Sequence, residues 1–384
     1  LPVTFQGRLG ILTYSTKPRG GVVHSLELAE ALQASGIDVH LFALGGPGES
    51  FFRPTSVPFT LFPAIEGATT LDDKVFASVD SMARGLATTA SAFDLLHAQD
   101  CISARAAVRV RDAGAGPPVV RTVHHVDDFT TAALIDCQRK AILEPDHVLV
   151  VSRAWQETLL REYGVDAQIV HNGVRTDRFP PISDEVRSGL RDSVRAENRT
   201  VLLAVGGVEP RKGSRELFEA VGLLRSRGLR VVLVILGGHS FQDYEAYRLA
   251  TLALLPGLGL CLGDDVHQIG TVDDLTLAQW FRAADILAYP SVKEGFGLVA
   301  LEALAADLPV VASSIPVFGE FLTDHVNALL PRVSDPVALA NALEELILNP
   351  GLRERLVAAG REVVPRYTWD ESAARHAELY AELL

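Results

Sequence analysis

Short, continuously apolar runs alternate with helical patterns along almost the whole chain. Strands that are apolar throughout are buried on both faces, as in a parallel sheet covered by helices. The predicted strands are Leu9–Tyr14, Val39–Ala43, Leu95–His97, Val119–Val123, Val148–Val151, Gln168–Val170, Val201–Val205, Arg230–Leu236, Val266–Gly270, Ile286–Tyr289 and Pro309–Ala312. The predicted helices between and after them include Val22–Ser35, Leu71–Ser91, Arg153–Glu162, Arg215–Arg227, Asp274–Ala283, Leu298–Ala306, Pro336–Leu348 and Thr368–Leu384. The fold class is therefore predicted to be α/β.

The alternation breaks between Phe179 and Arg199, a stretch rich in Pro, Ser, Asp and Arg that predicts a linker with one polar helix. A chain of 384 residues is long enough for two domains of roughly 150–200 residues each. We predict two tandem Rossmann-like domains, 1–178 and 179–367, that face each other across a cleft. A last helix at 368–384, begun by the capping-box pattern Thr368-x-x-Glu371, is expected to pack back onto the first domain.

Net charge, cysteine content and the length of apolar runs limit the kinds of partner and the cellular compartment that we expect for this chain. The formal net charge of −13 argues against nucleic acid as a partner, although association with a membrane surface stays open. Cys101, Cys137 and Cys261 are too far apart in sequence for a zinc motif, and three cysteines favour a reducing compartment over a disulfide scaffold. No apolar run reaches the ~18–20 residues of a membrane span, and the N-terminus lacks a signal-peptide pattern. We therefore expect a cytoplasmic protein, of unassigned oligomeric state.

Two glycines follow the predicted strand Ile286–Tyr289 and precede the predicted helix Leu298–Ala306. Such a turn lets backbone N–H groups at the helix N-terminus point at an anion. Glu294 and Glu302 flank the turn, and each carboxylate can accept hydrogen bonds from neighbouring hydroxyls of a sugar or a ribose. The two acids alone suit an ordinary loop and a solvated helix equally well. With the glycines and the strand, the pattern favours a binding site formed by Glu294, Gly295, Phe296, Gly297, Leu298 and Glu302.

A second glycine-rich loop follows the first strand of the second domain. Arg211 and Lys212 lie in this loop and can neutralise a diphosphate, Arg as a fork and Lys as a point charge. An Arg-Lys pair by itself is more often ordinary surface. Its place after a strand, between glycines and upstream of Glu294, favours diphosphate binding by Gly206, Gly207, Arg211 and Lys212.

The first domain contributes weaker signals. Gly20 and Gly21 follow the first strand and open a helix, which serves a tight turn as readily as an anion site. His124 and His125 follow the strand Val119–Val123. His124 is the better candidate for a ligand contact, and His125 is the second candidate. The alternative without a ligand is that the histidine is buried and has a structural role only.

Glu294-x7-Glu302 with Gly-Phe-Gly inside it, and Gly206-x5-Lys212-Gly213, resemble the signatures of retaining GT-B glycosyltransferases, family 4 type (glycosyl transferases group 1). The resemblance covers nearly the whole chain. It implies that Glu294 and one histidine, His124, contact the donor sugar and that Glu302 holds the ribose. It also implies backbone contacts to sugar and phosphate from Phe296, Gly297 and Leu298, with Gly20 and Gly21 bordering donor phosphate and acceptor.

The implied substrates are a nucleotide-sugar, UDP- or GDP-linked, and an unidentified acceptor, which is a small molecule, a glycan or a lipid. The resemblance implies retention of anomeric configuration. No Asp-x-Asp stands where it would hold a metal–diphosphate, so we expect no metal and no cofactor, with Arg211, Lys212 and helix N-termini balancing the leaving charge. The working mechanism is a front-face, substrate-assisted displacement with His124, Glu294, Arg211 and Lys212 as the catalytic set.

Two alternatives stay open: a UDP-sugar epimerase or other GT-B enzyme, and a non-catalytic nucleotide-sugar-binding protein. Two segments depart from the family pattern. Ser313–Glu320 lacks the paired glycines expected after the strand Pro309–Ala312, and residues 239–265 have no assigned role.

Overall fold

The computed structural model describes residues 5–238 and 244–383, and the chain divides into two compact units. The first holds the chain up to Gly173 and again from Tyr367 onward, and the second is Val174–Arg366. Residues 174–178, which the sequence analysis assigns to the first domain, lie in the second unit. The reason is local: Arg178 bonds to Asp274 and Glu302 of that unit.

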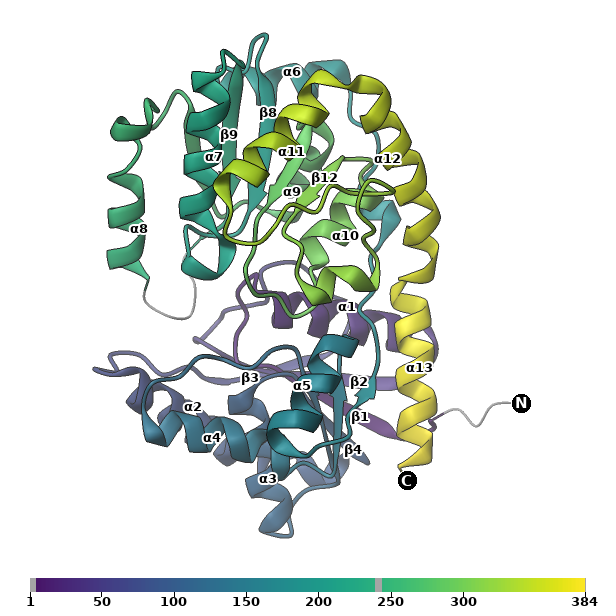
Figure 1. The fold of residues 1–384 in the computed structure, drawn as a ribbon. Coiled ribbons are helices and arrows are strands. Elements are labelled where there is room, and N and C mark those ends of the chain that lie inside the picture. The colour runs from purple at the N-terminus through teal and green to yellow at the C-terminus, as the bar shows by residue number, and fades with distance from the viewer. Residues whose placement is uncertain (1–4, 239–243, 384) are drawn as a thin grey trace. The chain divides into compact units, whose positions relative to one another are not determined.

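The first unit is built on a seven-stranded parallel sheet in the order β3-β2-β1-β4-β5-β6-β7. Figure 1 labels β1, β2, β3 and β4 of this sheet. Its core is apolar: Leu9, Ile11 and Leu12 of the central strand β1 have no exposed surface. The strands are β1 (Arg8–Leu12), β2 (Asp38–Gly45), β3 (Phe59–Pro63), β4 (Leu95–Ala98), β5 (Val119–Val123), β6 (His147–Val150) and β7 (Gln168–Ile169).

Helices cover both faces of this sheet, because right-handed crossovers to opposite sides of β1 place helices on opposite faces. One face carries α1 packed against the C-terminal helix α13, and the other carries α2, α3 and α4 in a row. The bounds are α1 (Gly20–Ala34), α2 (Leu71–Leu86), α3 (Cys101–Asp112), α4 (Ala132–Leu143), α5 (Arg153–Tyr163) and α13 (Trp369–Glu382), with a 3₁₀ turn η1 at Ala90–Ala92.

The second unit has a five-stranded parallel sheet in the order β10-β9-β8-β11-β12. Its strands are β8 (Thr200–Val205), β9 (Val231–Leu236), β10 (Val266–Gly270), β11 (Ile286–Tyr289) and β12 (Val310–Ala312). Its α-helices are α6 (Asp184–Ser193), α7 (Ser214–Ser226), α8 (Glu245–Leu252), α9 (Asp274–Ala283), α10 (Leu298–Ala305), α11 (Pro336–Leu348) and α12 (Pro350–Val363). Its 3₁₀ turns are η2 (Thr176–Arg178), η3 (Pro210–Lys212), η4 (Pro256–Leu258), η5 (Pro316–Glu320) and η6 (Val364–Arg366).

Strand order reverses once in each sheet, between β1 and β4 in the first unit and between β8 and β11 in the second. In open α/β sheets, ligands bind beyond the carboxyl ends of the strands at this switch point. The loop before α1 follows β1, and the two glycine-rich loops of the second unit follow β8 and β11. Topology therefore singles out the same loops as the sequence motifs.

The predicted elements differ from the structure in a few places. The helix predicted to Ser91 ends at Leu86, because the Thr88 hydroxyl donates to the carbonyl of Gly85 at 2.7 Å and the chain turns into η1. Strand β3 is absent from the prediction, since Pro58 precedes it, Pro63 ends it, and most of its residues are exposed or half-buried. Within the unassigned segment 239–265, residues 239–243 lie outside the described residues, and α8 and η4 occupy part of the remainder.

Candidate functional site

The loops after β8 and β11 meet at the carboxyl edge of the second sheet. Gly213 has a φ of 63°, and a Cβ added to it would lie 2.2 Å from the carbonyl oxygen of Pro290. The backbone N–H of Val292 donates to the carbonyl of Arg211 at 2.9 Å. Only glycine permits both the left-handed backbone and this approach, so Gly213 joins the two loops that the motifs identified.

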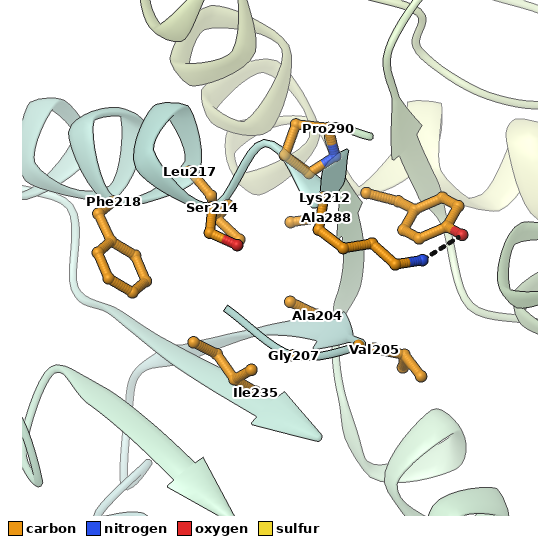
Figure 2. A pocket seen from close by; sticks show the side chains of 12 residues that line it. Ala204, Val205, Gly207, Lys212, Ser214, Leu217, Phe218, Ile235, Ala288 and Pro290 are labelled. Atoms are coloured by element: carbon orange, nitrogen blue, oxygen red, sulfur yellow. Dashed lines mark hydrogen bonds between the residues drawn. The ribbon is translucent and has the colours of Figure 1, made fainter. Parts of the chain in front are cut away.

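Arg211, Lys212 and Glu294 form an ion cluster across these loops. The Lys212 Nζ donates to Glu294 Oε1 at 2.7 Å, and the Arg211 Nη1 donates to Glu294 Oε2 at 3.0 Å. Tyr289, the last residue of β11, accepts a second bond from Lys212 at 3.1 Å (Figure 2). The structure thus brings together three of the four residues predicted to be catalytic.

Burial and pairing set the protonation of this cluster. Burial alone would raise the pKa of Glu294, but Lys212 and Arg211 outweigh burial and lower that pKa from 4.5 to about 2. Burial lowers the pKa of Lys212 despite its partner, and burial raises the pKa of Tyr289 well above 10.0. At neutral pH the glutamate is a carboxylate and the tyrosine is a neutral hydroxyl.

A pocket lies behind Lys212, between α7 and the ends of β8, β9 and β11. Figure 2 shows this pocket, with Lys212 among its lining residues and with Leu217, Phe218 and Ile235 as part of its apolar lining. Gly206 and Gly207 form part of the wall. An added Cβ at Gly206 would lie 2.9 Å from the Lys212 side chain, so this glycine makes room for the lysine.

The turn before α10 presents backbone rather than side chains. Phe296 is 2% exposed and packs on Phe321, so its ring belongs to the core. Gly297, the N-cap of α10, has a φ of 95°, and Leu298 is the first helical residue. An added Cβ at Gly297 would lie 2.5 Å from the ring of Phe318. Phe318 comes from the segment Ser313–Glu320, which departs from the family pattern.

The helices that open at the predicted ligand loops start differently from most others that follow a strand. In α3, α4, α5 and α9 a side chain caps the first turn: Asp100, Thr131, Ser152 and Asp273. Within the described chain, the N-cap residues of α1, α7 and α10 (Arg19, Gly213 and Gly297) make no such side-chain bond. Tyr244, the N-cap residue of α8, makes none either. Helix N–H groups without a protein cap suit an external anion.

Glu302, predicted to hold a ribose, is 8% exposed in α10. Its Oε1 accepts from the Nη1 of Arg178 at 2.6 Å, and the Nη2 of Arg178 donates to Asp274 at 2.9 Å. Sequence reasoning did not identify Arg178. Its partners are 96 and 124 residues away in sequence, and no local pattern signals such a pairing.

In the first unit, His124 lies beside the loop that opens α1. An added Cβ at Gly21 would lie 3.9 Å from the His124 ring, whereas Gly20 has open space. The His124 Nε2 lies 3.0 Å from the Oε1 of Gln99, the residue after β4, and burial lowers the pKa of His124 well below 6.5. His125 instead points outward and lies 3.3 Å from Asp127. Gln99 was missed because a single glutamine carries no motif.

A second histidine backs His124. The ring centroid of His24, a fully buried residue of α1, lies 4.6 Å from that of His124, and His24 bonds to Asn172 at 2.8 Å.

In residues 5–238 and 244–383 no group of three or more His, Cys, Asp or Glu is placed to hold a metal ion. Over the same residues, no helix combines the length and the apolar character that crossing a membrane requires.

Comparison with known proteins matches both halves of the chain. Residues 18–178 match the model of Glycosyltransferase Family 4, and residues 188–363 match that of Glycosyl transferases group 1. Phosphatidyl-myo-inositol mannosyltransferase of Mycobacterium leprae is 31% identical, covering 97% of this chain and 96% of that protein. D-inositol 3-phosphate glycosyltransferase of Xylanimonas cellulosilytica is 29% identical, covering 100% of this chain and 98% of that protein.

Two solved structures share the fold over 98% of this chain. Sucrose-phosphate synthase from Thermosynechococcus elongatus has a TM-score of 0.83 at 24% identity, with 99% of its own chain covered. Anabaena Alr3699/HepE, solved in complex with UDP-glucose, has a TM-score of 0.85 at 19% identity, with 100% of its chain covered. Two parallel-sheet α/β domains with these likenesses define a GT-B fold, as predicted.

The chain belongs to the glycosyl transferases group 1, of the family 4 type, and it is a glycosyltransferase. The predicted family, fold and enzyme class are confirmed. Its relatives over the full length are named glycosyltransferases and mannosyltransferases, which favours sugar transfer over the epimerase and the non-catalytic binding protein.

Proposed function

We propose that this glycosyltransferase transfers a sugar from a nucleoside-diphosphate sugar to an acceptor hydroxyl with retention of anomeric configuration. The observation that carries the proposal is the cluster of Arg211, Lys212 and Glu294 beside the N-termini of α7 and α10. Glu209 also lies 3.8 Å from the Nη2 of Arg211, so the cluster holds two basic and two acidic side chains, and the helix N-termini add the partial positive charge that favours an anion. Such a site suits a diphosphate attached to a polyhydroxylated sugar.

Each side chain then has a role in donor binding. Arg211 and Lys212 exchange part of their contact with Glu294 for phosphate oxygens, which leaves the Glu294 carboxylate to accept from sugar hydroxyls. The N–H groups of Gly297 and Leu298 meet phosphate, and Glu302 accepts from ribose hydroxyls. In the first unit His124, neutral at pH 7, contacts the sugar, and the N–H groups at Gly20 and Gly21 border phosphate and acceptor.

The chemical step is a front-face displacement. The bond between the anomeric carbon and the β-phosphate oxygen breaks, and the acceptor oxygen bonds to the anomeric carbon on the same face. The acceptor proton passes to the departing phosphate oxygen, so no protein nucleophile or base is needed. Arg211, Lys212 and the helix N-termini stabilise the charge that develops on the diphosphate, which makes the reaction independent of a metal ion.

The donor is a UDP- or GDP-sugar, and the acceptor is an inositol that carries a phosphate. The acceptor rests on the names of the full-length relatives, which act on D-inositol 3-phosphate or phosphatidyl-myo-inositol. The three cysteines are unpaired, which fits a reducing compartment such as the cytoplasm.

A turnover assay tests this proposal. UDP- and GDP-sugars are each paired with inositol 3-phosphate and with phosphatidylinositol vesicles, with EDTA present and absent. We expect transfer with one pair, the same anomeric configuration in product and donor by proton NMR, and no loss with EDTA. An inverted anomer contradicts the front-face mechanism. Activity lost in EDTA and restored by a divalent ion contradicts metal independence.

A further inference from the structure

We propose that Arg178 is a positioning residue for the nucleotide: it holds Glu302 in the orientation in which that carboxylate accepts hydrogen bonds from the ribose. This inference rests on the proposed role of Glu302 in donor binding. It adds a residue to which the sequence analysis gave no role, from the 3₁₀ turn η2 near the start of the second unit.

The guanidinium of Arg178 donates hydrogen bonds to two carboxylates, one from each terminal nitrogen. Nη1 bonds to Glu302 of α10 at 2.6 Å, and Nη2 bonds to Asp274 of α9 at 2.9 Å. The side chains of Arg178 and Glu302 are 16% and 11% exposed, so solvent screens their pairing weakly. A planar fork bonded at both ends fixes the direction of each bond, which a lysine cannot do.

The backbone that carries Arg178 is also anchored. Phe179 is 1% exposed, and its ring packs edge-on to Phe281 of α9 at 5.4 Å. The carbonyl of Phe179 accepts from the Nε of Arg282 at 2.9 Å. The backbone next to Arg178 is therefore held in place. Packing as well as charge sets the geometry of the ion pair between Arg178 and Glu302.

The pairing leaves Glu302 able to serve a ligand. A carboxylate offers about four acceptor positions, so the bond to Arg178 does not by itself exhaust them. Arg178 also places a positive charge beside this largely buried carboxylate, and an unpaired buried charge is strongly disfavoured. A carboxylate that is paired and fixed in direction can accept from the two adjacent hydroxyls of a ribose.

The same turn offers a matched control. Arg175 pairs with Asp177 at 3.0 Å, and these side chains are 45% and 70% exposed. An exposed pair of this kind contributes little to stability or to the geometry of neighbouring groups. Arg175→Gln removes one arginine charge at the N-cap of η2 and leaves the bond between Arg178 and Glu302 in place, so it separates that contact from the change in net charge.

The test compares ribose with a ribose that lacks its hydroxyls. Dissociation constants of UDP and GDP and of their 2′,3′-dideoxy counterparts are measured by calorimetry for the wild-type chain, Arg178→Gln, Arg178→Lys and Arg175→Gln. Hydrogen bonds to a charged acceptor predict that the wild type prefers the ribonucleotide by roughly 10- to 100-fold. We expect the preference to fall towards 1 in Arg178→Gln, to fall partly in Arg178→Lys, and to stay unchanged in Arg175→Gln.

Preservation of the wild-type preference in Arg178→Gln, with both nucleotides weakened equally, would mean a structural role and would overturn the inference. If Arg178→Gln does not fold, Arg178→Lys and Asp274→Asn decide by the same ratio, because each disturbs the fork and leaves Glu302 in place. A wild-type chain that binds no nucleoside diphosphate refutes the proposed function itself, an outcome distinct from a failure of Arg178.

Discussion

Around the carboxyl edges of their sheets, the two units keep buried polar side chains in different protonation states. In the first unit His24, His97 and His376 are buried, and burial lowers the pKa of each, to about 3 for His24 and about 4 for His376. In the second unit Glu294 is buried against Lys212 and Arg211 as a charged cluster. These histidines of the first unit are buried without charge, whereas Glu294 of the second unit is buried in ion pairs; the first unit also holds a largely buried ion pair, Arg53 with Glu27. Acid should therefore act on the first unit, and removal of charge on the second.

The largest effect is expected from removing charge in the second unit. Glu294→Gln and Lys212→Met should each lower kcat/KM for donor turnover by roughly 10²- to 10³-fold, because both act where charge develops. Glu219→Gln, which removes a carboxylate paired with Arg215 on α7, is the control and should retain activity. Wild-type turnover by both Glu294→Gln and Lys212→Met would show that this cluster does not act in the reaction.

Contact between the two loops of the second unit can be broken without touching a charge. Gly213→Ala should cost at least about 3 kcal/mol, because a left-handed φ and a clash with Pro290 act together. Gly228→Ala is the matched control: its φ is 82°, but nothing lies within 4 Å of an added Cβ, so about 1–2 kcal/mol is expected. Urea unfolding measures both. An equal loss in the free energy of unfolding for the two variants would show that the backbone at Pro290 moves aside and that the two loops are not rigidly joined.

The histidines of the first unit predict a specific response to acid. A histidine whose folded pKa is below 6.5 stabilises the fold fully above pH 6.5, and this contribution is lost as the pH falls towards the folded pKa. For His376 the loss reaches roughly 3 kcal/mol by pH 4. Glu294 behaves differently: its contribution is present above pH 4.5 and is lost only as the pH falls towards about 2.

Hydrogen exchange, corrected for intrinsic rates, separates the two units. Between pH 7 and pH 5 the amides of α13 should lose protection while those of α7 keep theirs. His376→Leu should reduce the loss, and His125→Ala, an exposed histidine, should leave it unchanged. A parallel loss in α7 and α13 would contradict the contrast between the units.

Much of the fold follows from the sequence because its signals are local. A buried parallel strand is an apolar run, and a ligand loop is a glycine turn at a strand end, so β8, β11 and the residues around Gly213 and Gly297 were predictable. Strand β3 was not, since it pairs on one side only, ends at Pro63 and buries little of itself. Tertiary pairing made it a strand.

The residues of the candidate site were largely predictable from the sequence, but the contacts between them were not. Motif spacing identifies Arg211 and Glu294 separately, but nothing local shows that they bond across 83 residues. The same holds for Gln99 beside His124, for Tyr289 under Lys212 and for Arg178 on Glu302. These supporting side chains belong to no repeated spacing, and only the packed structure joins them to the residues they support.

The smallest effect is expected at Tyr289. Tyr289→Phe keeps the ring, which lies 4.8 Å from the Lys212 ammonium, and removes the hydroxyl that accepts from it. The hydroxyl also bonds to Glu294, and loss of the bonds made by an uncharged hydroxyl at a site whose ion pairs remain predicts a fall of about 5- to 10-fold in kcat/KM. A fall as large as that of Lys212→Met would mean that Tyr289 contacts substrate itself.

The central claim is that the Arg211–Lys212–Glu294 cluster binds the diphosphate of the donor. Thermal unfolding of the wild type, Lys212→Met and Glu219→Gln in UDP, GDP, ADP and dTDP tests it most directly. A ligand at 100 times its Kd stabilises the native state by about 2.7 kcal/mol. We predict that one nucleoside diphosphate stabilises the wild type and Glu219→Gln, and that Lys212→Met loses most of this shift. No shift with any of the four, or an undiminished shift in Lys212→Met, would contradict the claim.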